Sequence, residues 1–258
     1  MGSESGSDPG SDPNCMSRVR LDQLLLDRQL VPTRERAKAL VLAGRVTVDG
    51  QTVTKAGTAV DDSADVALVV PDHPYVGRGG LKLAHALDTF QIPVEGRECL
   101  DIGASTGGFT DVMLQRGAAR VVALDVGHGQ LDWRLRQDPR VVVLEHVNAR
   151  GLTLEMLPGT VNLVTIDVSF ISLSRIFPAV PPVMRAGADL VALVKPQFEA
   201  GRAEVRKGII RSAAIHARVL DEVTAAGAEV GLTRVALTPS PITGQKGNVE
   251  FLVHFRLA

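Results

Sequence analysis

The hydrophobic pattern divides the chain into two parts. In the first part, leucines three and four positions apart predict a helix over residues 18–28, and Thr33 is placed to cap a second helix that ends at Gly44. Alternating apolar and polar residues then predict a hairpin over residues 45–53, with an Asp-Gly turn at its centre. We therefore expect a small domain of two helices and a hairpin at residues 17–70.

From residue 98 onward, apolar runs of strand length alternate with segments of helix length. This alternation predicts an α/β fold in which helices cover both faces of a mostly parallel sheet. Ligands of such sheets bind where the strands end, at their carboxyl termini. The predicted strands are 99–102, 121–124, 141–144, 161–166 and 190–194.

The composition between the two parts predicts a linker. Residues 57–76 are acidic and contain a Pro-Asp-His-Pro sequence, which does not allow a continuous helix. We place the linker at residues 71–77 and a second domain at residues 78–258.

The overall composition is that of an ordinary globular protein, with 45 % hydrophobic and 22 % charged residues. The longest apolar runs have strand length, far short of the roughly 18 residues that a membrane helix needs. Cys15 and Cys99 lie far apart, which excludes a disulfide framework and a zinc site, so we expect no metal and a cytoplasmic location. Residues 1–16 are rich in Gly, Ser, Asp and Pro, so we expect a flexible tail, with translation starting at either Met1 or Met16.

The net charge of −1 hides a basic segment near the N-terminus. Residues 16–56 contain eight basic and four acidic residues, and acidic residues lie on both sides of this segment. Such a segment fits the phosphate backbone of a nucleic acid, and a solvated helix face is an equal alternative on charge alone. Residues 202–218 form a second basic tract with the same two alternatives. The candidate RNA-contacting residues are Arg18, Arg20, Arg34, Arg36, Lys38 and Arg45.

A glycine-rich turn, Asp-Ile-Gly-Ala-Ser-Thr-Gly-Gly-Phe-Thr, occupies residues 101–110 after the first strand of the large domain. Asp125 ends the second strand, where a carboxylate can accept hydrogen bonds from ribose hydroxyls. Ser105 stands where a dinucleotide site needs glycine, which disfavours NAD, and the chain has no P-loop sequence. The pattern is typical of an S-adenosylmethionine site, and the alternative is a tight turn that binds nothing. The candidate cofactor-binding residues are Gly103, Ser105, Gly107, Gly108, Asp125, Asn148 and Asp167.

Two lysines and two acids occupy positions near strand ends. Lys82 precedes the first strand of the large domain, Asp167 ends the fourth, Lys195 ends the fifth and Glu250 begins the last. We expect Asp167 and Lys195 to lie together, because they end neighbouring strands beside the glycine-rich turn. The alternative for any one of the four is an ordinary surface ion pair.

These motifs resemble those of known families. The order Arg-Leu-Asp at 20–22, Thr-Arg at 33–34 and Gly-x-Val-x-Val-Asp-Gly at 44–50 resembles the RNA-binding domain of the ribosomal-protein-S-four type. The two lysines and two acids look like the Lys-Asp-Lys-Glu tetrad of FtsJ-like ribose 2′-O-methyltransferases. Over residues 17–257 the chain closely resembles the TlyA (haemolysin A) family of ribosomal RNA methyltransferases. The blocks that carry this resemblance are 103–110, 125–131, 167–173 and 194–199.

The resemblance implies a Rossmann-like methyltransferase sheet preceded by a small α+β RNA-binding domain. It implies S-adenosylmethionine as the methyl donor and the 2′-hydroxyl of a cytidine in ribosomal RNA, within ribosomal subunits, as the acceptor. Some members have longer termini and modify both subunits. The short C-terminus here favours the large subunit, and the extended N-terminus leaves both open. One alternative is an RNA or ribosome assembly factor that binds the cofactor without catalysis, and a less favoured one is a haemolysin.

The reaction explains why these residue types are needed. A ribose hydroxyl is a poor nucleophile, so methyl transfer needs a base and in-line placement. A free lysine has a pKa of about 10.4, and a second cation together with partial burial lowers that pKa. Our hypothesis is that Lys195 takes the hydroxyl proton and Asp167 orients it, while Lys82 and Glu250 position the ribose and tune the charge. Phe170 either stacks on the target base or belongs to the core.

Overall fold

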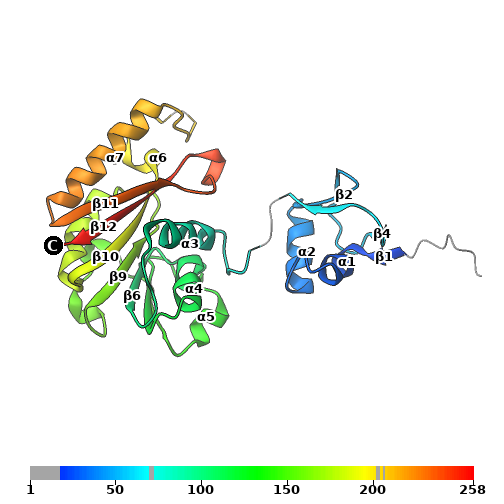
Figure 1. Cartoon of the computed structure of the whole chain (residues 1–258), viewed down its shortest axis with the longest axis horizontal. Coiled ribbons are helices and arrows are strands. Elements are labelled where there is room, and N and C mark those ends of the chain that lie inside the picture. The colour runs from blue at the N-terminus through cyan, green and yellow to red at the C-terminus, as the bar shows by residue number, and fades with distance from the viewer. Residues whose placement is uncertain (1–17, 70–72, 202–203, 206) are drawn as a thin grey trace, which may run out of the picture. The chain divides into compact units, whose positions relative to one another are not determined.

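The computed structural model of the chain describes residues 18–69, 73–201, 204–205 and 207–258. The chain separates into two compact units, Met1–Pro74 and Tyr75–Ala258 (Figure 1). The tail that the sequence predicts at residues 1–16 lies outside the described residues. None of the helices in the described ranges is long and apolar enough to span a membrane.

The first unit combines short helices and short strands. Its elements, within residues 18–69, are β1 (Arg18–Arg20), α1 (Leu21–Asp27), α2 (Arg34–Leu42), β2 (Val46–Val48), β3 (Gln51–Thr52), β4 (Ala59–Asp61) and β5 (Val66–Leu68). The prediction of a helix from residue 18 is wrong at its start, because residues 18–20 pair with β4 as a strand. The capping prediction is confirmed, since the Thr33 hydroxyl accepts a hydrogen bond from the Arg36 backbone N–H at 3.2 Å.

The hairpin of the first unit is also confirmed. β2 pairs with β3, and the turn between them is formed by Asp49 and Gly50, whose φ angles of 50° and 76° are those of a type I′ turn. Strands β4 and β5 were not predicted, and they pair with β1 and β2 respectively. Buried apolar residues of α1, α2, β2, β4 and β5 pack into one core.

The second unit is built on a seven-stranded sheet with the strand order β11-β12-β10-β9-β6-β7-β8. Its strands are β6 (Glu98–Ile102), β7 (Arg120–Leu124), β8 (Val141–Leu144), β9 (Val161–Ile166), β10 (Met184–Val194), β11 (Leu232–Pro239) and β12 (Phe251–Leu257). β12 runs antiparallel to its neighbours β10 and β11, and the pairs from β10 to β8 are parallel. The predicted mostly parallel sheet is therefore confirmed. β10 begins at Met184 and not at residue 190, because Met184 already pairs with Val161 across a bulge.

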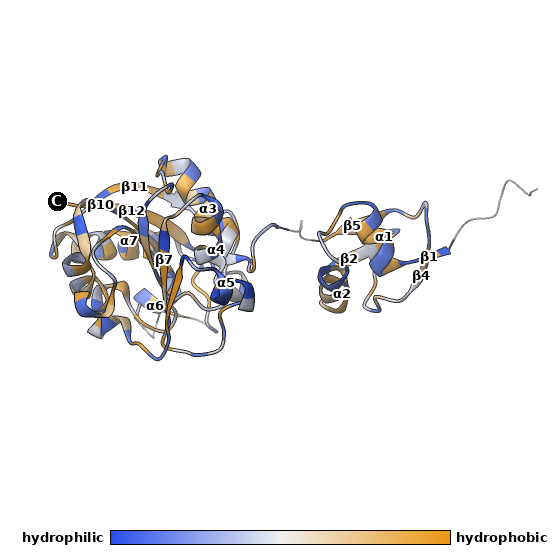
Figure 2. Ribbon diagram, turned by 90° about the horizontal axis from the view of Figure 1, so that it is seen from below, coloured by the Kyte–Doolittle hydropathy of each residue, from blue (hydrophilic) through white to orange (hydrophobic). Residues whose placement is uncertain are grey.

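Helices cover both faces of this sheet. The helices are α3 (Gly79–Phe90), α4 (Gly108–Gln115), α5 (Trp133–Gln137), α6 (Pro196–Glu199) and α7 (Ala213–Ala228). Apolar residues of α3, α4 and α5 pack on one face, whereas α7 and several 3₁₀ turns pack on the other. The buried strand residues between these layers form the orange centre of the unit in Figure 2. The burial of both sheet faces explains why these strands read as continuous apolar runs.

Three neighbouring strands end at the same edge of the sheet. Ile102 at the end of β6 and Ala192 near the end of β10 both pair with Ile166, the last residue of β9. Residues that directly follow β6, β9 and β10 are therefore neighbours in space, although they lie far apart in the sequence. This edge carries the candidate site.

Candidate active site

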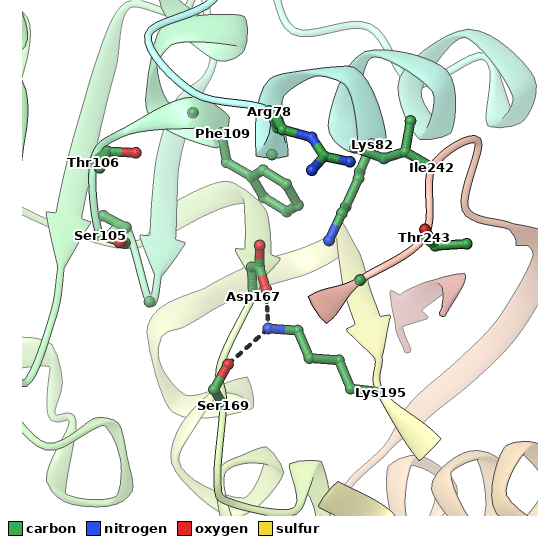
Figure 3. A pocket seen from close by; sticks show the side chains of 15 residues that line it. Arg78, Lys82, Ser105, Thr106, Phe109, Asp167, Ser169, Lys195, Ile242 and Thr243 are labelled. Carbon is green, nitrogen blue, oxygen red and sulfur yellow. Dashed lines mark hydrogen bonds and ion pairs between the residues drawn. The ribbon is translucent and has the colours of Figure 1, made fainter. Parts of the chain in front are cut away.

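The four predicted residues meet at this edge of the sheet, and Figure 3 shows three of them, Lys82, Asp167 and Lys195. Asp167 follows β9, Lys195 follows β10, Lys82 projects from α3 and Glu250 precedes β12. A cavity of about 320 Å³ lies between them, and Lys82, Asp167 and Lys195 line it. The Glu250 side chain is buried behind Lys82 and is only 3 % exposed.

The four side chains form two separate ion pairs. Lys195 Nζ lies 2.6 Å from Asp167 Oδ1, and Lys82 Nζ lies 2.5 Å from Glu250 Oε2. Each amine is thus held by a carboxylate, and each pair joins elements that are distant in the sequence. This arrangement can place a base and a second polar group on opposite walls of one cavity.

Glycines allow the walls of this cavity to approach one another. A side chain at Gly103, whose φ is +85°, would overlap the backbone carbonyl of Asp167. A Cβ atom at Gly108 would lie 2.9 Å from the backbone nitrogen of Gly80, so glycine lets α4 begin directly against α3. A Cβ atom at Gly244 would overlap the Glu250 carboxylate. Glycine at these positions therefore keeps Asp167 and Glu250 within reach of the cavity.

The glycine-rich turn is held by Asp125. Its Oδ2 accepts a hydrogen bond from the Ser105 backbone N–H at 2.8 Å, and its Oδ1 accepts one from the Gly127 N–H at 2.7 Å. Ser105 itself has a φ of +50°, and Gly107 has a φ of +97° just before α4 begins. The chain thus passes through left-handed conformations three times between β6 and α4, at Gly103, Ser105 and Gly107, which opens a backbone-lined hollow above the strand ends.

A second cavity of about 450 Å³ adjoins the first. Gly103, Ser105, Asp167 and Ser169 line both cavities. Besides these shared residues, the second cavity is lined by two more of the predicted cofactor residues and by several apolar side chains, namely Asp125, Asn148, Val126, Ile171 and Ile176. Two adjoining cavities that share Asp167 can hold two reacting molecules side by side.

Asn148, a predicted cofactor residue, also has a structural role in a turn. Its Oδ1 accepts a hydrogen bond from the Arg150 backbone N–H at 3.1 Å, which is the turn-forming role. Asn148 also lines the second cavity. The turn therefore fixes a side chain at the place where a ligand would meet it.

Phe170 is 87 % exposed, so the alternative of a core role is wrong for this residue. Its φ of +65° lies in the left-handed region, and its ring centroid lies 4.8 Å from that of Phe198. Phe170 also lines the second cavity. An exposed aromatic pair beside the site is a suitable surface for a flat partner.

Sequence reasoning missed three residues of the site. Arg78 lines the first cavity, and its guanidinium points towards Lys82 in Figure 3. Ser169 accepts a hydrogen bond from Lys195 Nζ at 2.9 Å. Asp101 is fully buried beneath the site, where burial raises its pKa to about 7. Asp101 and Ser169 lie in the conspicuous segments 101–110 and 167–173, and their place at strand ends was the signal that could have found them; Arg78, just before α3, carried no such signal.

Of the six basic candidates in the first unit, Arg20 and Arg34 share one carboxylate partner. The guanidinium of Arg20 donates two hydrogen bonds of 3.0 Å to Asp22, and Arg34 Nε donates a third to the same carboxylate at 3.0 Å. Asp22 is fully buried, and its hydrogen bonds with Arg20 lower its pKa to about 2. Asp22 therefore fixes the two arginines beside each other, while both stay about half exposed.

The other basic candidates lie elsewhere on the first unit. Arg36 lies on α2, with its guanidinium 3.4 Å from His73 Nε2. Arg18 opens β1, Lys38 lies on α2 and Arg45 precedes β2, and within residues 18–69 none of these three pairs with Asp22.

The second basic tract is partly neutralised within the protein. In the described part of residues 202–218, Arg218 forms ion pairs with Glu204 and Glu222, which compensate its charge.

The described residues contain no group of three or more His, Cys, Asp or Glu side chains arranged as metal ligands.

Known proteins resemble this chain over nearly its whole length. A family model described as FtsJ-like methyltransferase matches residues 75–257, and an S4 domain model matches residues 19–66. The 16S/23S rRNA (cytidine-2′-O)-methyltransferase TlyA of Mycobacterium tuberculosis is 48 % identical over 241 residues, which cover 93 % of this chain and 90 % of that protein.

Two further relatives extend the comparison. Hemolysin A of Brachyspira hyodysenteriae is 42 % identical over 239 residues, which cover 92 % of this chain and 99 % of that protein. A solved structure of a protein from Streptococcus thermophilus that carries the name hemolysin is 46 % identical, with a TM-score of 0.75, and covers 95 % of this chain and 90 % of its own. The chain therefore belongs to the TlyA (hemolysin A) family, whose members join an S4 domain to an FtsJ-like methyltransferase domain.

Proposed function

We propose that the chain methylates the ribose 2′-hydroxyl of a cytidine in ribosomal RNA, with S-adenosylmethionine as the methyl donor. The observation that carries the proposal is the ion pair of Lys195 and Asp167, which lies where the two cavities adjoin. Transfer to a poor nucleophile requires a base beside the donor site, and this pair meets that requirement. The relative from Mycobacterium tuberculosis, at 48 % identity, carries this activity in its name.

The lining of the second cavity fits the donor. The Asp125 carboxylate at the end of β7 suits ribose hydroxyls, and Val126 and Ile171 provide an apolar wall for a purine. Gly103 has no side chain, so its backbone lines the cavity directly, and a Cβ atom there would overlap the backbone carbonyl of Asp167. S-adenosylmethionine would supply an electrophilic methyl group on a positively charged sulfur.

The chemistry of the chain itself then falls to the two ion pairs. Asp167 holds the Lys195 amine beside the first cavity, and Lys195 in its neutral form accepts the proton of the 2′-hydroxyl. Lys82, fixed by Glu250, offers a second polar contact to the acceptor ribose. Arg78 adds positive charge to the same wall, which favours a phosphate of the substrate backbone.

The S4 domain supplies further contacts to RNA. Arg20 and Arg34 present two guanidinium groups at a fixed spacing, set by Asp22, and such forks suit phosphate oxygens. Arg18, Arg36, Lys38 and Arg45 complete the proposed set of RNA contacts. The exposed ring of Phe170 is placed to stack on a target base that has left its helix.

Labelled methyl transfer to isolated large and small ribosomal subunits tests this function. We expect one or both subunits to accept the label, and mapping should locate it at the 2′-oxygen of a cytidine. Lys195→Ala should abolish transfer, whereas Arg185→Ala, at the opposite end of the same strand β10, should retain it. Cofactor binding without transfer to either subunit would refute the proposal and would favour an assembly factor.

A further inference from the structure

Lys195 Nζ has two fixed partners. It lies 2.6 Å from Asp167 Oδ1 and 2.9 Å from Ser169 Oγ (Figure 3). Both partners belong to the segment that follows β9, two residues apart, and Ser169 lines both cavities. The carboxylate of Asp167 explains the charge balance of this amine, but it does not explain why a hydroxyl is placed beside it.

The direction of the lone pair provides the explanation. A neutral amine has two N–H bonds and one lone pair, and rotation about the Cε–Nζ bond moves all three together. One acceptor leaves the lone pair free to point in two directions, because either N–H can serve that acceptor. Here the hydrogen bond to Ser169 engages one N–H, and the negative Asp167 carboxylate, an ion-pair partner 2.6 Å from the nitrogen, repels the lone pair, so the lone pair is confined to the remaining direction.

We propose that Ser169 is a positioning residue for Lys195, and that with Asp167 it fixes the lone pair of the neutral amine for the approach of the ribose 2′-hydroxyl. This inference rests on the proposed function. In the step itself the hydroxyl proton moves to Lys195 Nζ, and the hydroxyl oxygen forms a bond to the methyl carbon. The carbon–sulfur bond breaks, and its electron pair stays on the sulfur. Lys195 becomes an ammonium ion and keeps its ion pair with Asp167 and its hydrogen bond to Ser169.

The loop that carries Ser169 is tied to the helix that follows Lys195. Glu199, at the end of α6, accepts a hydrogen bond from Ser172 Oγ at 2.5 Å and one from the Leu173 backbone N–H at 3.0 Å. The loop after β9 and the turn after β10 are thereby held together, so the Ser169 hydroxyl and the Lys195 amine belong to one rigid arrangement. A hydroxyl held in this way can restrict its neighbour without much cost in entropy.

The alternative role for Ser169 is contact with the cofactor, because the residue lines the donor cavity as well. The two roles give different kinetics. A residue that orients the base lowers the rate of the chemical step and leaves cofactor affinity unchanged, whereas a cofactor contact weakens cofactor binding.

Three variants separate these roles. Ser169→Ala removes the hydroxyl, Ser169→Thr keeps it, and Ser174→Ala removes a hydroxyl from the same loop that contacts Ser172 and not Lys195. The measurements are the single-turnover rate of methyl transfer to the ribosomal subunit that accepts the label, at saturating S-adenosylmethionine, and the cofactor Kd by calorimetry.

We expect Ser169→Ala to slow single-turnover transfer by about tenfold or more, a typical effect of losing orientation, with the cofactor Kd within twofold of the wild-type value. Ser169→Thr should recover most of the rate, and Ser174→Ala should match the wild type. A wild-type rate of transfer by Ser169→Ala would overturn the inference. A weakened cofactor Kd together with a wild-type rate at saturating cofactor would also overturn it, because Ser169 would then be a cofactor contact. If the unmodified chain transfers no methyl group, the proposed function itself has failed; if Lys195→Ala keeps the wild-type rate, Lys195 is not the base and the inference about Ser169 fails with it.

Discussion

The buried carboxyl group of Asp101 should make the stability of the fold depend on pH. Its side chain lies in β6 with no exposed surface, and both carboxylate oxygens are hydrogen-bonded. Thr110 donates to Oδ2 at 2.6 Å and Thr165 donates to Oδ1 at 3.0 Å. Burial raises the pKa of Asp101 to about 7, these hydrogen bonds act against the rise, and the negative charge of Asp167 adds to it. The variant Asp101→Asn keeps the shape of the side chain and removes its titration.

The sign and size of the effect follow from the two pKa values. The folded chain binds the Asp101 proton more tightly than the unfolded chain, whose pKa is near 3.8. The protonated acid therefore stabilises the fold fully below about pH 4, and this contribution is lost as the pH rises towards 7 and beyond. A rise of about three pKa units corresponds to at most about 4 kcal/mol of unfolding free energy. The Asp101→Asn variant has no titrating group at this position, so its unfolding free energy should not fall in this way as the pH rises.

Urea unfolding of the wild type and of Asp101→Asn from pH 5 to pH 8 measures the difference in their unfolding free energies. Titrations of other groups are common to the two proteins and cancel in this difference. We expect the variant to gain about 2–3 kcal/mol on the wild type between pH 5 and pH 8, because the part of the loss between pH 4 and pH 5 lies outside this range. Asp138→Asn is the matched control: Arg140 lowers the pKa of this surface carboxyl, so its difference from the wild type should stay flat over the same range. A flat difference for Asp101→Asn, or one that grows towards acid, would contradict the reasoning.

Three shorter predictions concern the glycine-rich turn, the buried Asp22 that holds Arg20 and Arg34, and the exposed Phe170. Gly103→Ala should weaken S-adenosylmethionine binding at least tenfold in calorimetry, because the new methyl group would overlap the backbone carbonyl of Asp167 in the wall of the cavity, and unchanged affinity would disprove this. Asp22→Ala should lower the unfolding free energy of the chain by about 1–3 kcal/mol in denaturant titrations, since two arginines lose a buried partner, and an unaltered midpoint would disprove it. Phe170→Ala should slow methyl transfer to the ribosomal subunit about tenfold without changing cofactor affinity, and Phe170→Trp should retain the rate if stacking is the cause.

The sheet of the second unit could be predicted from the sequence because its strands are buried on both faces. Continuous apolar runs at 121–124 and 161–166 leave little choice of structure. The positions of Asp167 and Lys195 at neighbouring strand ends followed from the same pattern. In the first unit, Thr33 and the Asp-Gly turn were readable because caps and tight turns depend on local residues.

The remaining features depend on partners distant in the sequence. β1 is a strand only because β4, about 40 residues later, pairs with it, and a three-residue segment carries no period that could reveal this. The pairing of Lys82 with Glu250 joins residues 168 positions apart. The raised pKa of Asp101 comes from complete burial, and an aspartate beside a glycine-rich turn gives no sign of its depth.

The pairing within the tetrad also decides which lysine can serve as the base. Removing a proton from Lys82 would leave the Glu250 carboxylate, which is 3 % exposed, without a counter-charge, and an uncompensated buried charge is costly. The Asp167 side chain is 21 % exposed and lines both cavities, so water and substrate dipoles can compensate it when Lys195 is neutral. The same four residue types thus divide into a structural ion pair and a reactive one, and burial rather than residue identity makes the division.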